Sequence, residues 1–150
     1  MIAFDSVTVR AGATTLLHDI TFSMEKGEKV VIGGPTGSGK STILMTLLGA
    51  HVPAKGTIRF NGIPLSPATV GTIRKQVAYI AQEPVLGTGL VREGLLLPFS
   101  FKANRHRQPS VDQINATLSR LLLPPAILDR DIALISGGEK QRIAIARALL

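Results

Sequence analysis

The feature that most constrains this chain is a glycine-rich segment, Gly34-Pro35-Thr36-Gly37-Ser38-Gly39-Lys40-Ser41, which matches the pattern G-x-x-x-x-G-K-[ST]. Glycines here let backbone N–H groups turn inward around phosphate oxygens, at φ angles that a side chain would penalise. Lys40 is then placed to reach the β- and γ-phosphates, and the Ser41 hydroxyl to ligate Mg²⁺. A chance match in a chain of this size is about one in a hundred or rarer. We therefore interpret the segment as a phosphate-binding loop.

The residues on either side of this loop support the interpretation. Lys29–Ile32 contains consecutive β-branched residues, as expected of a buried parallel strand. The residues after the loop, from Lys40 to about Gly49, predict a helix that ends before Pro53. The N-terminus of such a helix adds a dipole that favours a bound anion.

The first half of the chain is otherwise predicted to be rich in β-structure. Alternating apolar residues between Ile2 and Met24 predict two strands separated by a turn at Gly12. Further strands are predicted at Gly56–Phe60, followed by an Asn61-Gly62 turn, and at Val77–Ala81.

The second half is predicted to be helical. From Pro84 to about Ile135 the strand-like alternation of apolar residues ends, and leucines recur at helical spacing in Val111–Leu123. Gly137–Leu150 is an alanine-rich segment that predicts a last helix.

Composition indicates one globular domain and argues against a membrane-spanning, secreted or disulfide-bonded protein. Of 150 residues, 45% are apolar and 18% charged, an ordinary globular balance. No run approaches the roughly 20 apolar residues of a spanning helix, and the opening residues lack the pattern of a signal peptide. We therefore expect a cytoplasmic protein whose role at a membrane is peripheral. The absence of cysteine excludes disulfides and thiolate zinc sites.

The net charge of +7 suits either nucleic acid or an anionic membrane surface. The basic residues are spread along the chain, however, and only Arg105-His106-Arg107 forms a cluster. We interpret this cluster as a solvated face and not as a binding patch. Because no aromatic residues are interleaved with basic ones, we expect no nucleic-acid partner.

A second motif is Ser136-Gly137-Gly138-Glu139-Lys140-Gln141-Arg142. Ser136 and Glu139 form the S-x-x-E pattern of a capping box at the start of the last helix. That pattern alone favours a simple helix cap. The two glycines between them, however, would let a phosphate approach the N-terminus of the helix closely.

With Ile135, this motif resembles the LSGGQ signature of the ABC ATPases, with Glu139 in place of the usual glutamine. Val77–Leu86, which contains Gln82, is similar to the strand and Q-loop of that family. The three motifs occur in the family's order, and the resemblance extends from Phe4 to Leu150. It implies an α/β fold of the P-loop NTPase class and the ABC ATPase type, with a β-rich N-terminal part, a P-loop core and a helical subdomain.

The resemblance also implies how the chain is divided. We expect residues 1–82 to form the antiparallel β part and the P-loop core up to the Q-loop. Residues 83–135 would form the helical subdomain, and residues 136–150 the signature helix.

Roles for particular residues follow from the resemblance alone. ATP would be held by the loop and the start of the helix after it, namely Gly34, Pro35, Thr36, Gly37, Ser38, Gly39, Lys40, Ser41 and Thr42. Ser136, Gly137, Gly138 and Glu139 would close over ATP bound to the opposite subunit of a head-to-tail homodimer. Ser41 and Gln82 would hold Mg²⁺, and Lys40 and Gln82 would act in catalysis. Leu95–Phe99 would lie where a permease docks, although a place in the helical core is equally consistent with each leucine.

Two features depart from the family's pattern. Ala11 stands where the family usually places an aromatic residue that stacks on adenine, which implies weaker binding or a substitute residue. The chain ends at Leu150, before the Walker B strand with its Mg²⁺-binding aspartate and general-base glutamate, and before the switch histidine. We therefore expect a fold truncated before the Walker B strand and a chain that is catalytically incomplete alone.

The resemblance implies an ATP-binding and ATP-hydrolysing motor subunit of an ABC transporter, peripheral on the inner face of the cell membrane and acting with a separate integral membrane permease. At finer grain, Ala81-Gln82-Glu83-Pro84 and Leu97-Pro98-Phe99 resemble small ABC ATPases paired with an iron or other metal exporter permease. A DNA-repair ATPase is disfavoured, because too few residues separate the motifs for a long coiled coil. A translation factor with two cassettes, or a remnant that binds nucleotide without hydrolysing it, remains an alternative.

Overall fold

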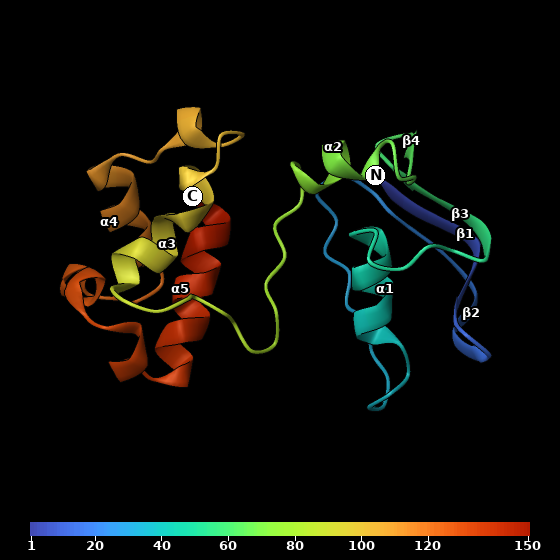
Figure 1. Ribbon diagram of the computed structural model, residues 1–150, viewed down its shortest axis with the longest axis horizontal. Helices are drawn as coiled ribbons and strands as arrows, with labels where there is room; N and C mark the ends of the chain where they lie inside the picture. The colour runs from blue at the N-terminus through green and yellow to red at the C-terminus, as the bar shows by residue number, and fades with distance from the viewer. The chain divides into compact units, whose positions relative to one another are not determined.

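Alternating apolar side chains build the two longest strands of the computed structural model, which describes residues 1–150 (Figure 1). Strand β1 (Ile2–Ala11) pairs antiparallel with β2 (Thr14–Met24). A turn containing Gly12, whose φ is 58°, joins them. The register of β1 shifts between Phe4 and Val7, and Ser6 has a φ of 50° at this bulge. The bulge turns both Phe4 and Val7 into the core, although an unbroken alternation would place them on opposite faces.

The remaining strands extend this sheet on the other side of β1. Strand β3 (Lys55–Phe60) pairs antiparallel with β1, and the short β4 (Ile63–Pro64) pairs with β3. The order is β2-β1-β3-β4. Between β3 and β4, Asn61 and Gly62 have φ angles of 49° and 80°, the pair of positive values required by a tight hairpin turn. The predictions of a strand ending at Phe60 and of this turn are confirmed, whereas β4 was not predicted.

Two helices complete the packing of residues 1–77, which form one of two units in the chain. Helix α1 (Lys40–Leu47) contributes Leu47 and Ile43 to the core beneath the sheet. Helix α2 (Val70–Arg74) contributes Ile73, which is fully buried. The buried residues of this core are Phe4, Val7, Val9, Leu17, Leu47, Ile58, Phe60 and Ile73.

Two predicted strands are absent, and these predictions were wrong. Lys29–Ile32 and Val77–Ala81 have no strand partner within residues 1–150. Their apolar β-branched residues favour extended backbone, but a strand also needs a neighbour to pair its N–H and C=O groups. Without that partner, Val31 is 93% exposed.

The second unit, Ala78–Leu150, is helical, as predicted for the greater part of it. Its α-helices are α3 (Val91–Ser100), α4 (Val111–Arg120) and α5 (Gly137–Leu149). Short 3₁₀ turns lie between them: η1 (Arg105–Arg107), η2 (Pro125–Asp129) and η3 (Ile132–Leu134). No helix in either unit is long and apolar enough to cross a membrane.

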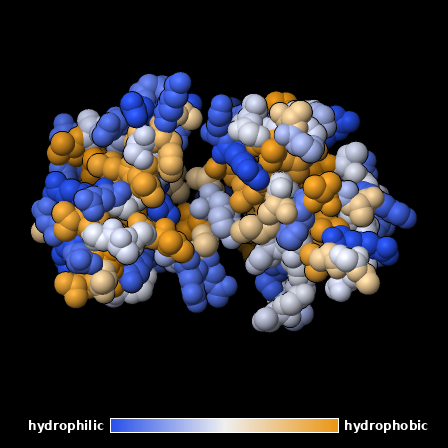
Figure 2. Space-filling view, viewed as in Figure 1, coloured by the Kyte–Doolittle hydropathy of each residue, from blue (hydrophilic) through white to orange (hydrophobic).

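The core of this unit gathers residues from all three α-helices and the turns. It consists of Leu86, Val91, Leu95, Ile114, Leu118, Leu123, Ile127, Ile132, Ile135, Ile143, Ala144 and Ala146. Helix α4 ends three residues before the predicted boundary at Leu123. Leu122 there has a φ of 55°, and this left-handed residue stops the helix before Pro124. The space-filling view shows apolar residues exposed among charged ones on both units (Figure 2).

Candidate functional site

The glycine-rich loop leads directly into helix α1, as its sequence predicts. Gly39 is the residue before the helix, and its φ is 90°. A Cβ atom at Gly39 would lie 2.7 Å from Leu17 Cδ2, and one at Gly34, whose φ is 143°, would lie 2.8 Å from Ser38 Oγ. Glycine is therefore favoured at both positions by backbone conformation, and a side chain at either would also displace its neighbour.

Lys40 folds back over this loop. Its Nζ donates hydrogen bonds to the carbonyl oxygens of Gly34, at 2.9 Å, and Pro35, at 2.6 Å. These contacts hold the ammonium group against the loop, although an ammonium group on four methylenes is otherwise a mobile charge. The loop therefore carries a positive charge fixed beside exposed backbone.

The start of α1 adds to this positive character. The helix has no acidic residue in its first turn and no side-chain cap at its N-terminus, so its first N–H groups remain free to bind an anion. Ser41 is exposed in this turn, and Thr42 is half-buried. The donors present — ammonium, hydroxyl and backbone N–H — fit a phosphate group, and a hydroxyl oxygen such as that of Ser41 is a suitable ligand for Mg²⁺.

The other predicted site residues lie in the unit of residues 78–150. Gln82 is exposed in an irregular segment before α3. Ser136, Gly137 and Gly138 are exposed at the start of α5. A Cβ atom at Gly137 would meet nothing within 4 Å, so the face of the helix end is open.

Ser136 and Glu139 form the predicted capping box. The backbone N–H of Ser136 donates to Glu139 Oε2 at 2.7 Å, and the N–H of Glu139 donates to Ser136 Oγ at 3.2 Å. Each side chain thus satisfies a backbone donor that the helix leaves free. The capping box fixes the direction in which the two glycines are presented.

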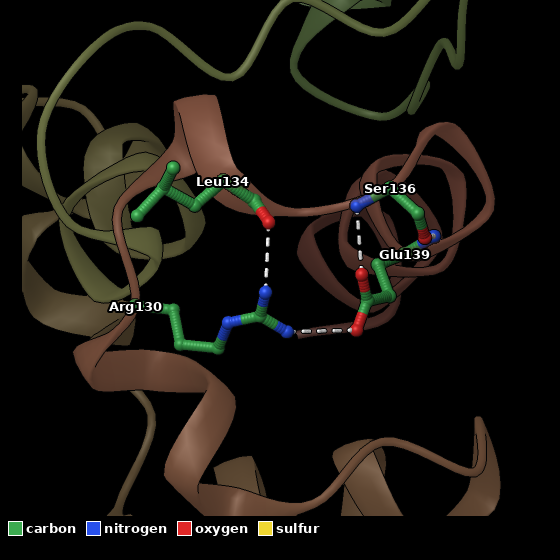
Figure 3. A network of polar contacts seen from close by, with 4 residues as sticks. All are labelled: Arg130, Leu134, Ser136 and Glu139. Carbon is green, nitrogen blue, oxygen red and sulfur yellow. Dashed lines mark hydrogen bonds and ion pairs between the residues drawn. The ribbon is translucent and has the colours of Figure 1, made fainter.

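Arg130 completes this arrangement and was not predicted from the sequence. Its guanidinium donates to Glu139 Oε1 at 3.2 Å and to the carbonyl oxygen of Leu134 at 2.7 Å (Figure 3). One side chain therefore ties the turn η3 to the start of α5. No local pattern indicates this contact, because it depends on the bend of the chain between Arg130 and Ser136.

The carboxyl group of Glu139 is held in its charged form. Hydrogen bonds from the backbone and side chain of Ser136 lower its pKa below the ordinary value for glutamate, and the nearby charges of Arg130 and Arg142 lower this pKa further. Both carboxylate oxygens already accept hydrogen bonds. Glu139 is therefore poorly suited to take a proton during a reaction.

The segment predicted to meet a permease divides between core and surface. Leu95 and Phe99 are buried in their unit, whereas Leu97 is 46% exposed. Ala11 is exposed at the end of β1. Whether these residues contact a permease or adenine stays a prediction.

The loop before α1 offers donors that suit a phosphate group, and comparison with known proteins gives the family of the chain. A family model described as ABC transporter matches residues 17–150. The chain therefore belongs to the ABC transporter family and contains sequence of its ATP-binding domain.

Individual relatives agree with this family. The probable iron export ATP-binding protein FetA of Escherichia coli (strain K12) is 38% identical over 149 residues, covering 99% of this chain and 65% of that protein. The nickel import ATP-binding protein NikE of Brucella abortus (strain 2308) is 37% identical over 141 residues, covering 90% of this chain and 53% of that protein. The chain thus spans less than two thirds of the length of either relative.

Solved structures confirm the ABC ATPase fold. A dimeric post-hydrolysis state of the ATP-binding cassette MJ0796, bound to ADP and phosphate, superposes with a TM-score of 0.80 at 28% identity, covering 99% of this chain and 69% of that one. A bacterial Atm1-family ABC exporter with ATP bound gives a TM-score of 0.83 at 27% identity, covering 99% of this chain and 27% of that one.

Proposed function

We propose that this chain provides the ATP-binding part of a motor subunit that drives transport through a separate integral membrane permease. The observation that carries the proposal is the loop that ends at α1, where Lys40 lies against the carbonyl oxygens of Gly34 and Pro35. Such a loop suits the phosphates of ATP, and Ser41 would supply a hydroxyl for Mg²⁺. We also propose that the transporter exports a metal ion, and the similarity to the probable iron export protein FetA supports this substrate class.

We further propose roles for the loop residues and for Gln82. Gly34, Pro35, Thr36, Gly37, Ser38, Gly39, Lys40, Ser41 and Thr42 would surround the phosphates. Ser41 and Gln82 would hold Mg²⁺, which would supply positive charge to offset that of the phosphates. Lys40 would stabilise the same charge from the protein side, and Gln82 would orient the attacking water.

The start of α5 would act on a second subunit. We propose that Ser136, Gly137 and Gly138 approach ATP held by the opposite subunit of a head-to-tail homodimer. The exposed glycines and the capped helix end support this role. Glu139 would keep the helix end in place and would not act as a base, because both of its oxygens are engaged.

Such a subunit would work at the cytoplasmic face of the cell membrane as a peripheral protein. Nucleic acid is not among the proposed partners.

The experiment uses a cassette of the length of its relatives and compares wild type with Ser136→Arg. ATP in the absence of Mg²⁺ should give a dimer of the wild type in size-exclusion chromatography. The variant should still bind ATP but stay monomeric, because a bulky cation prevents the approach of α5 to the second subunit. Ser110→Arg, which alters the equivalent cap of α4, is the matched control and should dimerise. A normal dimer from Ser136→Arg would refute the proposed role of this motif.

A further inference from the structure

A basic and apolar surface follows helix α3. Four exposed basic side chains lie close together in sequence: Lys102, Arg105, His106 and Arg107. Two apolar side chains accompany them, Leu97, which is 46% exposed, and Phe101, which is 59% exposed. No acidic residue occurs between Glu93 and Asp112. We call these six residues the basic–apolar patch.

The backbone of this patch is folded by hydrogen bonds around Phe101. The N–H groups of Asn104 and Arg105 donate to the carbonyl oxygen of Phe101 at 2.9 and 3.0 Å. Asn104 Nδ2 also donates to the carbonyl oxygen of Pro98 at 3.2 Å. Phe99, two residues before the exposed Phe101, is buried. The patch therefore lies on an ordered turn that follows a helix end anchored in the core.

The charges of the patch are not neutralised within the chain. The ion pairs of the structure are Arg92–Asp129 and Arg130–Glu139, and neither includes a patch residue. Uncompensated Lys and Arg beside exposed apolar side chains are typical of segments that rest on an anionic bilayer, with cations among the headgroups and apolar groups at the acyl boundary.

We propose that the basic–apolar patch binds the surface of a bilayer that contains anionic lipid. The sequence predicted a solvated face at Arg105–Arg107, and the exposed Phe101 and Leu97 beside it are the reason for the revision. A nucleic acid would also be attracted by the charge, but one aromatic residue offers no series of stacking positions for bases. The proposal uses no residue of the phosphate-binding loop, so it stands or fails apart from nucleotide binding.

Flotation of the 150-residue chain with vesicles tests the proposal and separates bound protein from aggregates, which sediment. The chain should float with phosphatidylcholine vesicles that contain phosphatidylglycerol and should not float with phosphatidylcholine alone. Added salt should weaken binding, because it screens the exposed charges. A single-stranded oligonucleotide, measured separately by fluorescence anisotropy, serves as the alternative polyanion.

A matched pair of variants distinguishes the patch from net charge. The triple variant Lys102→Gln, Arg105→Gln and Arg107→Gln should lose about 100-fold in affinity for the anionic vesicles, about fivefold for each charge. The control is Lys26→Gln, Lys29→Gln and Lys75→Gln, which removes the same charge from exposed positions in the other unit and should lose much less.

A tryptophan probe tests the apolar part of the patch. The chain contains no tryptophan, so Phe101→Trp gives a single tryptophan, which can be excited selectively. Its emission should shift to shorter wavelength on anionic vesicles, and brominated lipid should quench it. Val85→Trp, at another exposed apolar position, should show neither effect.

Four results would overturn the proposal. The first is an absence of binding to anionic vesicles. The second is an equal loss of affinity in the two triple variants, which would indicate net charge alone. The third is an unchanged Phe101→Trp emission spectrum. The fourth is patch-dependent binding of the oligonucleotide in place of the vesicles.

Discussion

Among single residues, Glu139 makes the contacts that hold the N-terminus of α5 in place. Its two carboxylate oxygens satisfy the backbone of Ser136 on one side and the guanidinium of Arg130 on the other. Arg130 in turn holds the carbonyl oxygen of Leu134. The glutamate thus gains a bond to Arg130 that a neutral glutamine amide would make less strongly, because hydrogen bonds between charged groups are stronger than neutral ones.

The pKa of Glu139 provides the first prediction. It is lowered in the folded chain, so the contribution of Glu139 to stability is complete above its unfolded pKa and is lost as the pH falls through the folded value. We expect NMR titration of the carboxyl carbon to give a midpoint below that of an exposed glutamate. Arg130→Ala should raise this midpoint, because a nearby positive charge is removed, whereas Arg92→Ala should leave it unchanged. A wild-type midpoint at or above the ordinary value would contradict the geometry.

Ala11 carries a second prediction at this scale. If adenine lies near the end of β1 without an aromatic partner, Ala11→Tyr should tighten ATP binding by about 1 kcal/mol, or roughly fivefold, from stacking. Isothermal titration of a cassette of the length of its relatives measures this change. Ala13→Tyr, at a nearby exposed position, controls for a general effect of tyrosine. No gain at Ala11 would show that adenine lies elsewhere or already has a partner.

Among the elements, helices α4 and α5 begin in the same way. Ser110 caps α4 and Ser136 caps α5, each with a reciprocal bond from the third residue of its helix, Gln113 or Glu139. A capping box satisfies two backbone donors that would otherwise be free. The caps therefore fix where both helices start.

These caps give the third prediction. Ser136→Ala and Ser110→Ala should each lower the free energy of unfolding by about 1 kcal/mol. Glu139→Gln should cost less than either serine variant, because glutamine can still bond the Ser136 N–H and a partly exposed ion pair contributes little. Urea unfolding followed by circular dichroism measures all three variants. A loss from Glu139→Gln as large as that from Ser136→Ala would mean that the ion pair and not the cap holds the helix.

The sequence predicted those elements that depend on local contacts. The capping box of Ser136, the glycines of the loop and the Asn61-Gly62 turn are set by residues a few positions apart. The strand at Lys29–Ile32 was predicted wrongly, because pairing depends on a distant partner that apolarity alone does not reveal. The bulge at Ser6 and the contact of Arg130 escaped prediction for a related reason, since both depend on how the chain bends.

Over the whole molecule, the exposed apolar segment at Lys29–Ile32 is the feature that most favours association with another chain. Val31 is 93% exposed in a segment without a strand partner. Unpaired backbone of this kind is a template for pairing with another chain. The unit of residues 1–77 therefore combines a packed core with an exposed segment that favours association.

The fourth prediction concerns this segment. Val31→Lys should increase the monomeric fraction of the 150-residue chain, because a charge opposes edge pairing. Analytical ultracentrifugation at several concentrations measures the change. Leu122→Lys, which adds the same charge at another highly exposed residue, should have little effect. Equal improvement by both variants would assign the effect to net charge.

The central claim is that the loop before α1 binds the phosphates of ATP through Lys40. The most direct measurement is equilibrium binding of ATP to a cassette of the length of its relatives, in wild-type and Lys40→Ala forms, with Lys75→Ala as the control. We expect ATP to bind the wild type and the control alike. Lys40→Ala should lose binding while its circular dichroism spectrum stays unchanged, because the lysine contacts only loop carbonyl oxygens and lies outside the core. Unchanged affinity in Lys40→Ala would contradict the assignment of this loop.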